Sequence, residues 1–438
     1  MAHRRVELDP SDLPRLVSHL AAVRAYPSIA WLDGDGSTSL GRFSFVGLGT
    51  TRALLGWGEV ARALDALSPR ARHDEPDIVR CAPQSSIALA YDLAWSMPIG
   101  IRRPRTIARA VDAPLAWMLE HALTIAVDHA AGEAWLVAED PSAIDRVVPL
   151  LELADAPDAS LAEITIGERE THRAAIVRAL EDIAAGDLYQ VNLARPFTSS
   201  LSGAALGLAL AMRAASPVPL GSYFEGPPYT HSSLIGRSME RFLAFDRSTH
   251  MLETRPIKGT RPRERGDDDA TRASLLADEK ERAEHAMIVD LMRNDLGRLA
   301  VPRSVRVREA MRVEPYARLS HLVSIVEARA REDVSLSNIL EATFPPGSVT
   351  GAPKLAAIER IESLERHARG FYTGAIGHVA RDGSLALAVA IRMAQVEGDR
   401  VTYFAGGGIV EASDPDRECD ETELKARVLF DAQRLLQH

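Results

Sequence analysis

Two pairs of glutamates are spaced so that a helix would turn both members of each pair to one face. Glu281 and Glu284 form the first pair, and Glu418 and Glu421 form the second pair near the C-terminus. Residues three or four apart are neighbours on a helix surface. Two such helices facing each other would bring four carboxylates to one point, and Mg²⁺ is the natural occupant because it prefers oxygen ligands. Each pair taken alone is more typical of a solvated helix edge.

Both pairs lie in segments whose patterns predict helices. Residues 278–296 contain neither proline nor glycine, carry apolar residues at helical spacing, and begin with an aspartate that can cap a helix. His285 lies on the same face as the first pair. In the second segment, Asp414 followed by Pro415 is a typical helix start, and Lys425 continues the acidic face. Since unpaired buried charge is costly, we expect partners for both acidic faces.

Several further residues could meet an anion or move a proton. The glycine run 406–408 lies between a predicted strand and the C-terminal helix, where backbone N–H groups can approach an anion; a flexible turn is the alternative. Lys258 is either a solvated side chain or a nucleophile. His321 is either a hydrogen-bonded core histidine or a group that orients substrate or transfers protons. Arg392 would be costly to bury without an anion, and the Tyr372 hydroxyl is available for a hydrogen bond.

Composition narrows the class of protein. The chain of 438 residues is long enough for two or three ordinary domains or one large composite domain. Its net charge of −10 argues against a nucleic-acid binder. The two cysteines, Cys81 and Cys419, provide no disulfide framework and fit a reducing compartment. The first ten residues lack a signal-peptide core, and no apolar run reaches the roughly 20 residues that span a bilayer, so we expect a soluble cytoplasmic protein without a membrane partner.

The elements that would position these residues divide the chain into two regions. Residues 1–155 contain no cluster of catalytic residue types and are predicted to be a scaffold or regulatory region. Strands are predicted there at 28–33, 42–47 and 86–91, and helices at 13–23 and 114–130. Residues 155–160 are polar, contain proline and are a plausible linker.

The second region, residues 165–435, is predicted to carry the catalytic residues. A helix from 167 to 185 ends at Gly186, and a glycine- and proline-rich loop over 344–354 opens a helix through residue 364. Residues 255–261 are predicted to form a loop. Strands are predicted at 187–196, 233–237, 241–245, 310–328, 372–380, 385–393 and 401–405, and residues 216–224 are predicted to be a proline-rich turn that enters a strand. This mixture of strand meanders and separate helices indicates an α+β fold.

Seven motifs occur in one order over residues 187–427. They are LYQVNLAR, RPIKGTRPR, DEKERAEHAMIVDLMRND, LSHLVS, FPPGSVTGAPK, GFYTGAIG and GGGIVEASDPDRECDETELKAR. With these motifs the chain resembles the chorismate-utilising enzymes, a family of anthranilate, aminodeoxychorismate, isochorismate and salicylate synthases. The N-terminal RFSFVG is similar to the amino-transferring branch. The resemblance implies large antiparallel sheets packed together with flanking helices.

Two positions within that family distinguish its branches. Water-adding members carry a lysine as general base where this chain has Gln190. The PIKGT segment, with Lys258, resembles aminodeoxychorismate synthase component I, whereas anthranilate synthases usually have PIAGT. The resemblance therefore favours amination of chorismate on the route to 4-aminobenzoate and folate. The alternatives are an anthranilate synthase large subunit and a catalytically idle subunit that senses an aromatic metabolite.

The resemblance also implies a metal and a set of substrate contacts. Mg²⁺ would be bound directly by Glu284 and Glu421, with Glu281 and Glu418 assisting, and would hold the ring carboxylate of chorismate. Residues implied to contact the substrate are Gln190, Ser348, Thr350, Tyr372, Arg392, Gly406, Gly408 and Lys425. The family more often has threonine at the position of Ser348.

The implied reaction uses a covalent intermediate. Lys258 would attack C2 of chorismate while the C4 hydroxyl leaves, Glu240 would protonate that oxygen, and His321 would lie close to the ring. Ammonia would then add at C4 and expel the lysine. The chain has Ser238-Met239-Glu240 where the family usually has Ser-Pro-Glu. Since neither cysteine has the setting of a glutaminase nucleophile, we expect ammonia from a separate glutamine amidotransferase subunit.

Overall fold

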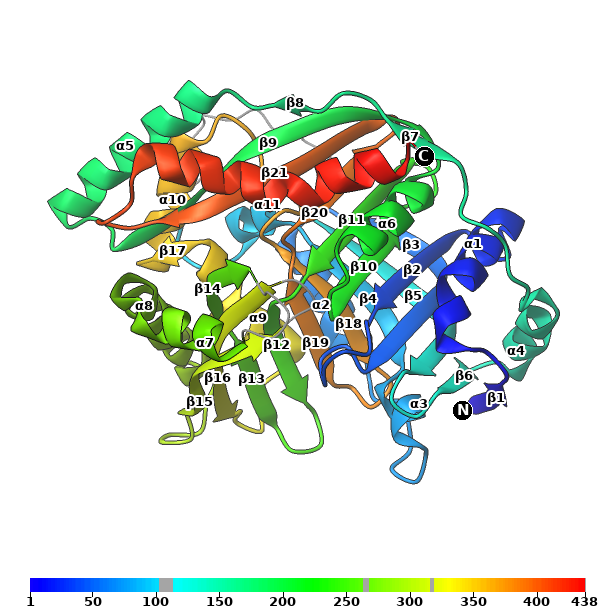
Figure 1. The fold of residues 1–438 in the computed structure, drawn as a ribbon. Coiled ribbons are helices and arrows are strands. Elements are labelled where there is room, and N and C mark those ends of the chain that lie inside the picture. The colour runs from blue at the N-terminus through cyan, green and yellow to red at the C-terminus, as the bar shows by residue number, and fades with distance from the viewer. Residues whose placement is uncertain (102–112, 263–267, 316–318, 438) are drawn as a thin grey trace.

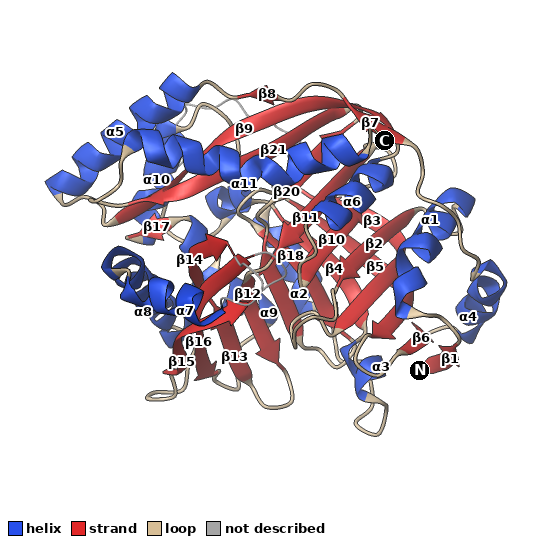
Figure 2. Cartoon of the chain, viewed as in Figure 1, coloured by secondary structure: helices blue, strands red, loops and turns tan. Residues whose placement is uncertain are grey.

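The computed structural model describes residues 1–101, 113–262, 268–315 and 319–437, and they form layers of antiparallel strands with helices on the outside (Figures 1 and 2). The helices and strands of the first region are β1 (Ala2–Val6), α1 (Leu13–Val23), β2 (Ser28–Asp33), β3 (Phe43–Leu54), α2 (Trp57–Asp65), α3 (Asp77–Cys81), β4 (Pro83–Leu89), β5 (Ala116–Asp128), β6 (Glu133–Ala138), α4 (Pro141–Val147) and β7 (Ala159–Leu161). The strands predicted at 28–33, 42–47 and 86–91 and the helix at 13–23 are all present, although β4 ends two residues before the predicted end of the third strand.

The second region supplies the remaining elements. Its helices are α5 (Arg169–Ala185), α6 (Ala205–Ala215), α7 (Asp268–Ala277), α8 (Glu279–Gly297), α9 (Leu336–Thr343), α10 (Lys354–Leu364) and α11 (Pro415–Leu435). Its strands are β8 (Thr165–Ile166), β9 (Gln190–Gly203), β10 (Leu220–Glu225), β11 (Ser232–Ser238), β12 (Arg241–Asp246), β13 (Met251–Arg255), β14 (Ile257–Pro262), β15 (Arg306–Pro315), β16 (Leu319–Arg329), β17 (Gly351–Ala352), β18 (Ala375–Ala380), β19 (Leu385–Val389), β20 (Met393–Glu397) and β21 (Arg400–Ile409). The α+β prediction is confirmed.

Strand pairing joins the two predicted regions. From β5, one series of antiparallel neighbours runs through β3, β2, β10, β11, β20 and β21 to β9. A second series runs from β5 through β4, β18, β19, β12 and β13 to β16. Both series therefore contain strands from residues 1–155 and strands from the second region. The division of the chain near residue 155 stays a prediction, and β7 lies partly within the proposed linker.

Local signals explain the helices that carry the acidic pairs. Helix α8 begins where Asp278 accepts a hydrogen bond from Glu281 N at 3.1 Å, and α11 begins where Asp414 accepts one from Arg417 N at 2.9 Å. Both side chains act as N-caps. Helix α5 ends at Gly186, whose left-handed φ of 86° suits glycine. All three predicted helices are confirmed.

The helix predicted at 114–130 is wrong, because this segment forms strand β5. β3 pairs along one edge of β5, and β4 and β6 divide the other edge. Nearly every side chain of β5 is buried on one face or the other. A strand buried on both faces lacks the polar–apolar alternation that distinguishes strands from helices, so its length and apolar content favoured the wrong element.

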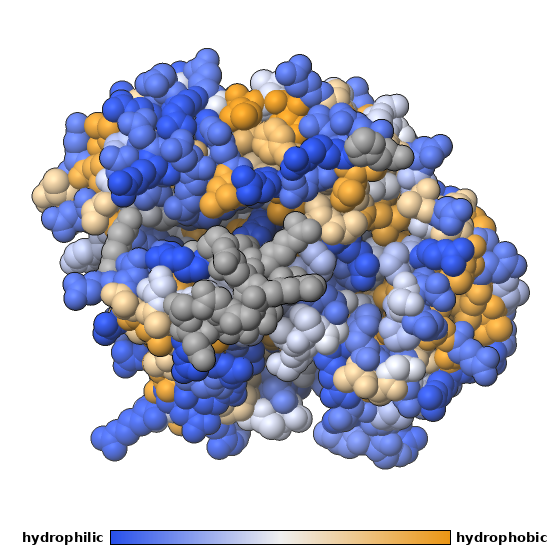
Figure 3. Space-filling model, viewed as in Figure 1, coloured by the Kyte–Doolittle hydropathy of each residue, from blue (hydrophilic) through white to orange (hydrophobic). Residues whose placement is uncertain are grey.

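Helices cover the sheet that carries the glycine run. α11 lies along β21, α5 and α10 contact β9, and α7 and α8 contact β14 and β16 (Figure 2). Apolar side chains of α11, β9 and β21 join those of α1, β2, β3, β5 and β6 in a single large core. Within the described residues, no helix is both long enough and apolar enough to cross a membrane. The face shown in Figure 3 is largely hydrophilic, with hydrophobic residues in separate patches.

We predict that Leu123→Ala, in β5, lowers the free energy of unfolding by about 2–5 kcal/mol. Leu123 is fully buried, and the truncation removes apolar contacts and leaves a cavity. Denaturant unfolding followed by circular dichroism measures the change. Leu435→Ala is the control, since Leu435 is 51% exposed and should change stability by no more than about 0.5 kcal/mol. Equal effects of both substitutions would contradict the assignment of β5 to the core.

Candidate active site

The predicted glycine run 406–408 lies within β21 and not in a linker. It pairs with residues 192–194 of β9. The Asn192 N–H donates to Thr350 O at 2.9 Å, on the side of β9 away from β21. In an antiparallel ladder, the opposite residue, Gly408, must then also direct its N–H and C=O away from β9. The strand therefore presents backbone polar groups toward the space where an anion site was predicted.

The glycine run is needed because other side chains come too close for a Cβ atom. A Cβ on Gly407 would lie 2.9 Å from Glu418 Oε2. A Cβ on Gly408 would lie 2.6 Å from Gln190 Nε2 and 3.1 Å from Lys258 Nζ. Three elements, α11, β9 and β14, thus place polar side chains against the same short stretch of bare backbone. The motifs that contain Gln190, Lys258 and Glu418 are distant in sequence and meet here.

Helix α11 turns its acidic face toward this backbone. Glu418 is buried, and its Oε1 accepts a hydrogen bond from Ser413 Oγ at 2.7 Å. One turn on, Glu421 forms an ion pair of 2.6 Å with Lys425. Lys425 Nζ also donates to Gly406 O at 2.8 Å. The two glutamates and the lysine therefore lie along the glycine edge of β21.

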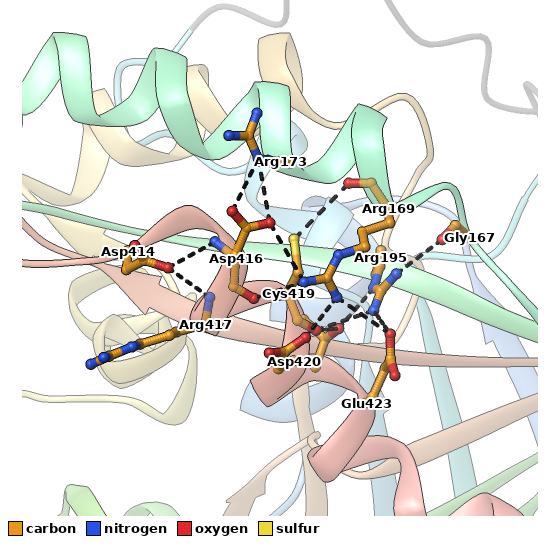
Figure 4. Close-up of polar contacts among 11 residues, drawn as sticks. Gly167, Arg169, Arg173, Arg195, Asp414, Asp416, Arg417, Cys419, Asp420 and Glu423 are labelled. Atoms are coloured by element: carbon orange, nitrogen blue, oxygen red, sulfur yellow. Dashed lines mark hydrogen bonds and ion pairs between the residues drawn. The ribbon is translucent and has the colours of Figure 1, made fainter.

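The adjoining face of α11 is bound by arginines, which fixes how the helix is rotated (Figure 4). Arg195 of β9 is buried and donates to Thr422 Oγ1 at 2.7 Å, Cys419 O at 3.1 Å and Glu423 Oε1 at 2.7 Å. Arg169 of α5 adds an ion pair to the same face. Because these partners alternate with Glu418 and Glu421 along the helix, binding one face directs the other face to the glycines.

Lys258 lies on a strand and not in the predicted loop. β14 pairs with β16, with an irregularity between Lys258 and Thr260. The residue between them, Gly259, has a left-handed φ of 67°, which is typical of a bulge. A bulge redirects the neighbouring side chains, and here the Lys258 ammonium lies beside Gly408, as does the amide of Gln190.

Glu240 is a buried carboxyl beside this lysine. It lies between β11 and β12 and is 5% exposed. Burial raises the pKa of Glu240 to about 7, with the Ser348 hydroxyl and then the Lys258 ammonium acting in the opposite direction. Near neutral pH the group can therefore hold a proton and give it up, which is the property of a general acid.

His321, Arg392 and Tyr372 lie on the same side of the site. Burial and, to a lesser extent, the nearby Arg392 lower the pKa of His321 to about 3, so the ring is neutral at neutral pH. Arg392 has a left-handed φ of 48° between β19 and β20, and its burial lowers the pKa of its guanidinium. The Tyr372 ring stacks on Phe404 at 5.4 Å between centroids. A neutral imidazole beside an arginine suits hydrogen bonding to an anionic ligand better than acid catalysis.

Three other residues predicted to contact substrate lie in strand β9 and in the loop that begins at residue 344. Gln190 is fully buried, and neither its amide oxygen nor its amide nitrogen has a hydrogen-bond partner among the described residues. An unpaired buried amide is unfavourable, so a ligand that satisfies it would gain affinity. The Ser348 hydroxyl forms a hydrogen bond with Glu240 that opposes the rise in the pKa of that carboxyl. Thr350 Oγ1 donates to Pro346 O at 2.8 Å.

Helix α8 approaches the same region from the other side. Arg261 of β14 lies 3.7 Å from Glu281, and a Cβ on Gly259 would lie 3.4 Å from Glu281 Oε2. Glu284 follows one turn later and is partly buried. His285 is fully buried, and its Nε2 lies 2.6 Å from Ser324 Oγ, so it faces the sheet. Both acidic helices therefore lie near the segment around Lys258. Glu281 of α8 lies beside Gly259 in β14, and Glu418 of α11 lies beside Gly407 in β21.

Carboxylates are suitable ligands for a hard cation, but in the described part of the chain they do not already form a metal site. In the described part of the chain, no three His, Cys, Asp or Glu side chains lie close enough together to hold a metal ion. Glu418 and Glu421 instead make the protein contacts given above, as does Glu281. Carboxylate oxygens are suitable Mg²⁺ ligands, so these residues fit the ion by the type of their donor atoms. Convergence of α8 and α11 on one ion stays a prediction.

The sequence analysis missed a buried ion pair behind the site. Arg369 and Glu365 lie 2.6 Å apart, with side chains 1% and 3% exposed. Glu365 and Arg369 are four residues apart, but the segment between Leu364 and Phe371 also contains Arg366 and His367, so no sequence signal distinguished this pair from solvated charges. Asn192, whose side-chain oxygen is buried, was also missed.

The raised pKa of Glu240 predicts a pH-dependent difference in stability between Glu240→Gln and the wild type. The unfolded carboxyl ionises near its ordinary value of 4.5, and the folded one at about 7. Wild-type stability is therefore lost relative to the glutamine variant as pH rises through this window, by on the order of 3 kcal/mol at pH 8. Thermal unfolding from pH 5 to pH 8 measures the difference. Met239→Leu, its uncharged neighbour, is the control and should show no such trend; a pH-independent difference for Glu240→Gln would contradict the prediction.

Comparison with known proteins supports a common origin. A family model of chorismate binding enzymes matches residues 63–431. Anthranilate synthase component 1 of Aquifex aeolicus is 40% identical over 259 residues, covering 59% of this chain and 51% of that protein. Aminodeoxychorismate synthase of Streptomyces griseus is 38% identical over 346 residues, covering 75% of this chain and 47% of that protein. The chain spans about half the length of these curated relatives.

The fold agrees with the sequence matches. The crystal structure of anthranilate synthase component I from Streptococcus pneumoniae TIGR4 superposes with a TM-score of 0.75 at 25% identity, covering 89% of this chain and 92% of that one. The expected large antiparallel sheets with flanking helices are confirmed. The family match includes every predicted site residue, and the chain belongs to the chorismate binding enzyme family.

Proposed function

We propose that this chain is an aminodeoxychorismate synthase component I, which aminates chorismate at C4. The observation that carries the proposal is the position of Lys258. Its ammonium lies against the glycine edge of β21 at Gly408, where the unpaired amide of Gln190 also lies, and its charge opposes the rise in the pKa of the buried Glu240. A nucleophile and a proton donor thus share one site.

The chain's own residues would divide the displacement into two steps. The amine of Lys258 attacks C2, both conjugated ring double bonds shift, and the C4–oxygen bond breaks. Glu240 transfers its proton to that oxygen, which leaves as water. Ammonia then attacks C4, both double bonds shift back, the bond from C2 to Lys258 breaks, and the new C4 ammonium returns a proton to Glu240. The pKa of about 7 for Glu240 supports its role as the acid.

Backbone and cationic groups would hold the two carboxylates of chorismate. The N–H groups of Gly406 and Gly408, together with Lys425, suit the ring carboxylate, because this edge of β21 directs polar groups away from β9. Arg392 and Tyr372 suit the enolpyruvyl carboxylate. His321, neutral and beside Arg392, would orient the ring by hydrogen bonding.

Ser348, Thr350 and Gln190 would complete the substrate contacts. Gln190 has two unpaired amide groups in the site, and a glutamine in place of a basic lysine disfavours activation of water. The Ser348 hydroxyl, close to Glu240, can help to position the departing oxygen. The glutamine at position 190 supports attack by ammonia and not by water.

Glu284 and Glu421 would bind Mg²⁺, with Glu281 and Glu418 assisting. When bound, the ion would neutralise the ring carboxylate and stabilise negative charge as the double bonds shift. Lys425 would then exchange its ion pair with Glu421 for the substrate carboxylate. The carboxylate donors and the approach of both acidic helices to the Lys258 region support this assignment.

Ammonia would come from a separate glutamine amidotransferase subunit. A glutaminase needs a cysteine whose thiolate is favoured. Burial raises the pKa of Cys81 to about 11, and burial also raises that of Cys419. Both shifts oppose thiolate formation, so neither cysteine suits this role.

Anthranilate synthase component I is the alternative function. The Aquifex aeolicus and Streptococcus pneumoniae relatives carry that name. That reaction ends in loss of pyruvate and an aromatic product. The lysine at position 258 favours the aminodeoxychorismate product, because it supplies a nucleophile to the site.

The product distinguishes these functions. We predict that the protein converts chorismate, in the presence of Mg²⁺ and ammonium, to 4-amino-4-deoxychorismate, identified by mass spectrometry. Glutamine alone should support no turnover, because the cysteines are not activated. Formation of fluorescent anthranilate would establish the alternative. Turnover on glutamine without a second subunit would contradict the proposed source of ammonia.

We predict that Lys258→Ala reduces kcat for amination by on the order of 100-fold or more, because the covalent route is lost. Lys258→Arg is the matched variant, since it keeps the positive charge and length but is a poor nucleophile. Both variants should be inactive while binding chorismate. Wild-type rates in either variant would remove covalent catalysis by Lys258 from the mechanism.

A further inference from the structure

Arg369 uses all of its hydrogen-bonding capacity in the protein interior. A guanidinium has five N–H donors in a rigid plane. Nε donates to Glu365 Oε2 at 2.9 Å, and Nη2 donates to Glu365 Oε1 at 2.6 Å. The other three donors reach Asn192 O at 2.6 Å, Thr373 Oγ1 at 3.0 Å and Val349 O at 3.3 Å. No donor is left over for a ligand.

Those three acceptors belong to three separate segments, each next to a proposed substrate contact. Asn192 lies two residues after Gln190 on β9. Val349 lies between Ser348 and Thr350. Arg369 therefore connects β9 to the loop that carries both hydroxyl contacts. A single planar group fixes the distance between segments that are more than 150 residues apart in the chain.

The third acceptor, Thr373 Oγ1, connects Arg369 to Tyr372. Thr373 Oγ1 accepts from Arg369 and donates to Tyr372 O at 2.6 Å. Thr373 has a left-handed φ of 61°, which is unfavourable for a β-branched residue and needs support from its surroundings. The guanidinium also lies 5.9 Å from the Tyr372 ring centroid and 4.7 Å from that of Tyr91. Arg369 therefore orients Tyr372 in two ways, through the backbone at Thr373 and through its contact with the tyrosine ring.

Glu365 extends the connection to a second point on β9. Its Oε1 accepts from Ala194 N at 2.8 Å, and Ala194 lies opposite Gly406. This bond orients the Ala194 N–H away from β21, as the Asn192–Thr350 bond does for Asn192. The ion pair therefore also maintains the orientation of the glycine edge.

We propose that Arg369, held by Glu365, is a positioning residue that fixes the substrate-facing side of the active site without touching substrate. The inference rests on the proposed function for the identity of the substrate. It assigns one buried ion pair to the alignment of Gln190, Ser348, Thr350 and Tyr372. The acidic residues of α8 and α11 are outside its contacts.

The test compares Arg369→Lys with Arg381→Lys. Arg381 is as fully buried as Arg369, but its side chain lies near Thr124 and Val137 of the first region. A lysine cannot replace five planar donors. We expect amide hydrogen exchange in Arg369→Lys to rise roughly tenfold at 189–194, 347–351 and 371–374 together. Arg381→Lys should leave these three segments unchanged.

Kinetics provide a second readout. In Arg369→Lys, KM for chorismate should rise and kcat/KM should fall on the order of 100-fold, because misplaced contacts lose binding and alignment. The Mg²⁺ concentration for half-maximal rate should stay unchanged, because the carboxylates lie outside the network. Glu365→Gln keeps the shape of the carboxylate and provides the same readouts if Arg369→Lys does not fold.

The outcomes separate this inference from the proposed function. Exchange that rises only at 364–373, or rises equally in Arg381→Lys, would overturn the positioning role whatever the reaction. An equal loss of affinity for Mg²⁺ and chorismate would also overturn it. A wild-type protein that makes no amination product would instead refute the proposed function, while the exchange measurement would still decide whether Arg369 connects the three segments.

Discussion

The active site depends on a strand that has no side chains where four elements meet. Along Gly406, Gly407 and Gly408, a Cβ atom would come too close to groups from β9, α11 or β14. The resulting close approach places an ammonium, an amide and carboxylates around exposed backbone dipoles. Pairing with β9 keeps this strand straight and its polar groups aligned. Larger residues there would separate the elements that the site has to bring together.

Charge burial is the second constraint. A carboxylate or guanidinium taken from water is unfavourable unless it has partners, and the interior provides them in two ways. Arg369 makes five hydrogen bonds and Arg195 makes four, which makes them rigid supports. Glu240 is kept partly protonated by burial, and the amide of Gln190 has no partner among the described residues. The two supporting arginines are bonded to the protein, whereas the Gln190 amide, proposed to contact substrate, is left unpaired.

This arrangement explains how related enzymes can share a framework and differ in chemistry. The sheets, the glycine edge and the supporting arginines determine where the side chains of the candidate site lie. Gln190 and Lys258 come from different strands but approach the same glycine. Substitution at either position would change the nucleophile available in the site without altering strand pairing.

Local sequence determined the elements whose signals are contained within a few residues. Caps at Asp278 and Asp414 and the glycine at 186 predicted the ends of three helices, and the ordered motifs predicted the fold. Only the tertiary structure decided the identity of β5 and β14 and the place of the glycine run, because burial on both faces and pairing with distant strands override local patterns. It also decided the charge state of Glu240 and the role of Arg369. Burial sets the first, and the second depends on acceptors such as Asn192 O, 177 residues away in sequence, which no short motif can encode.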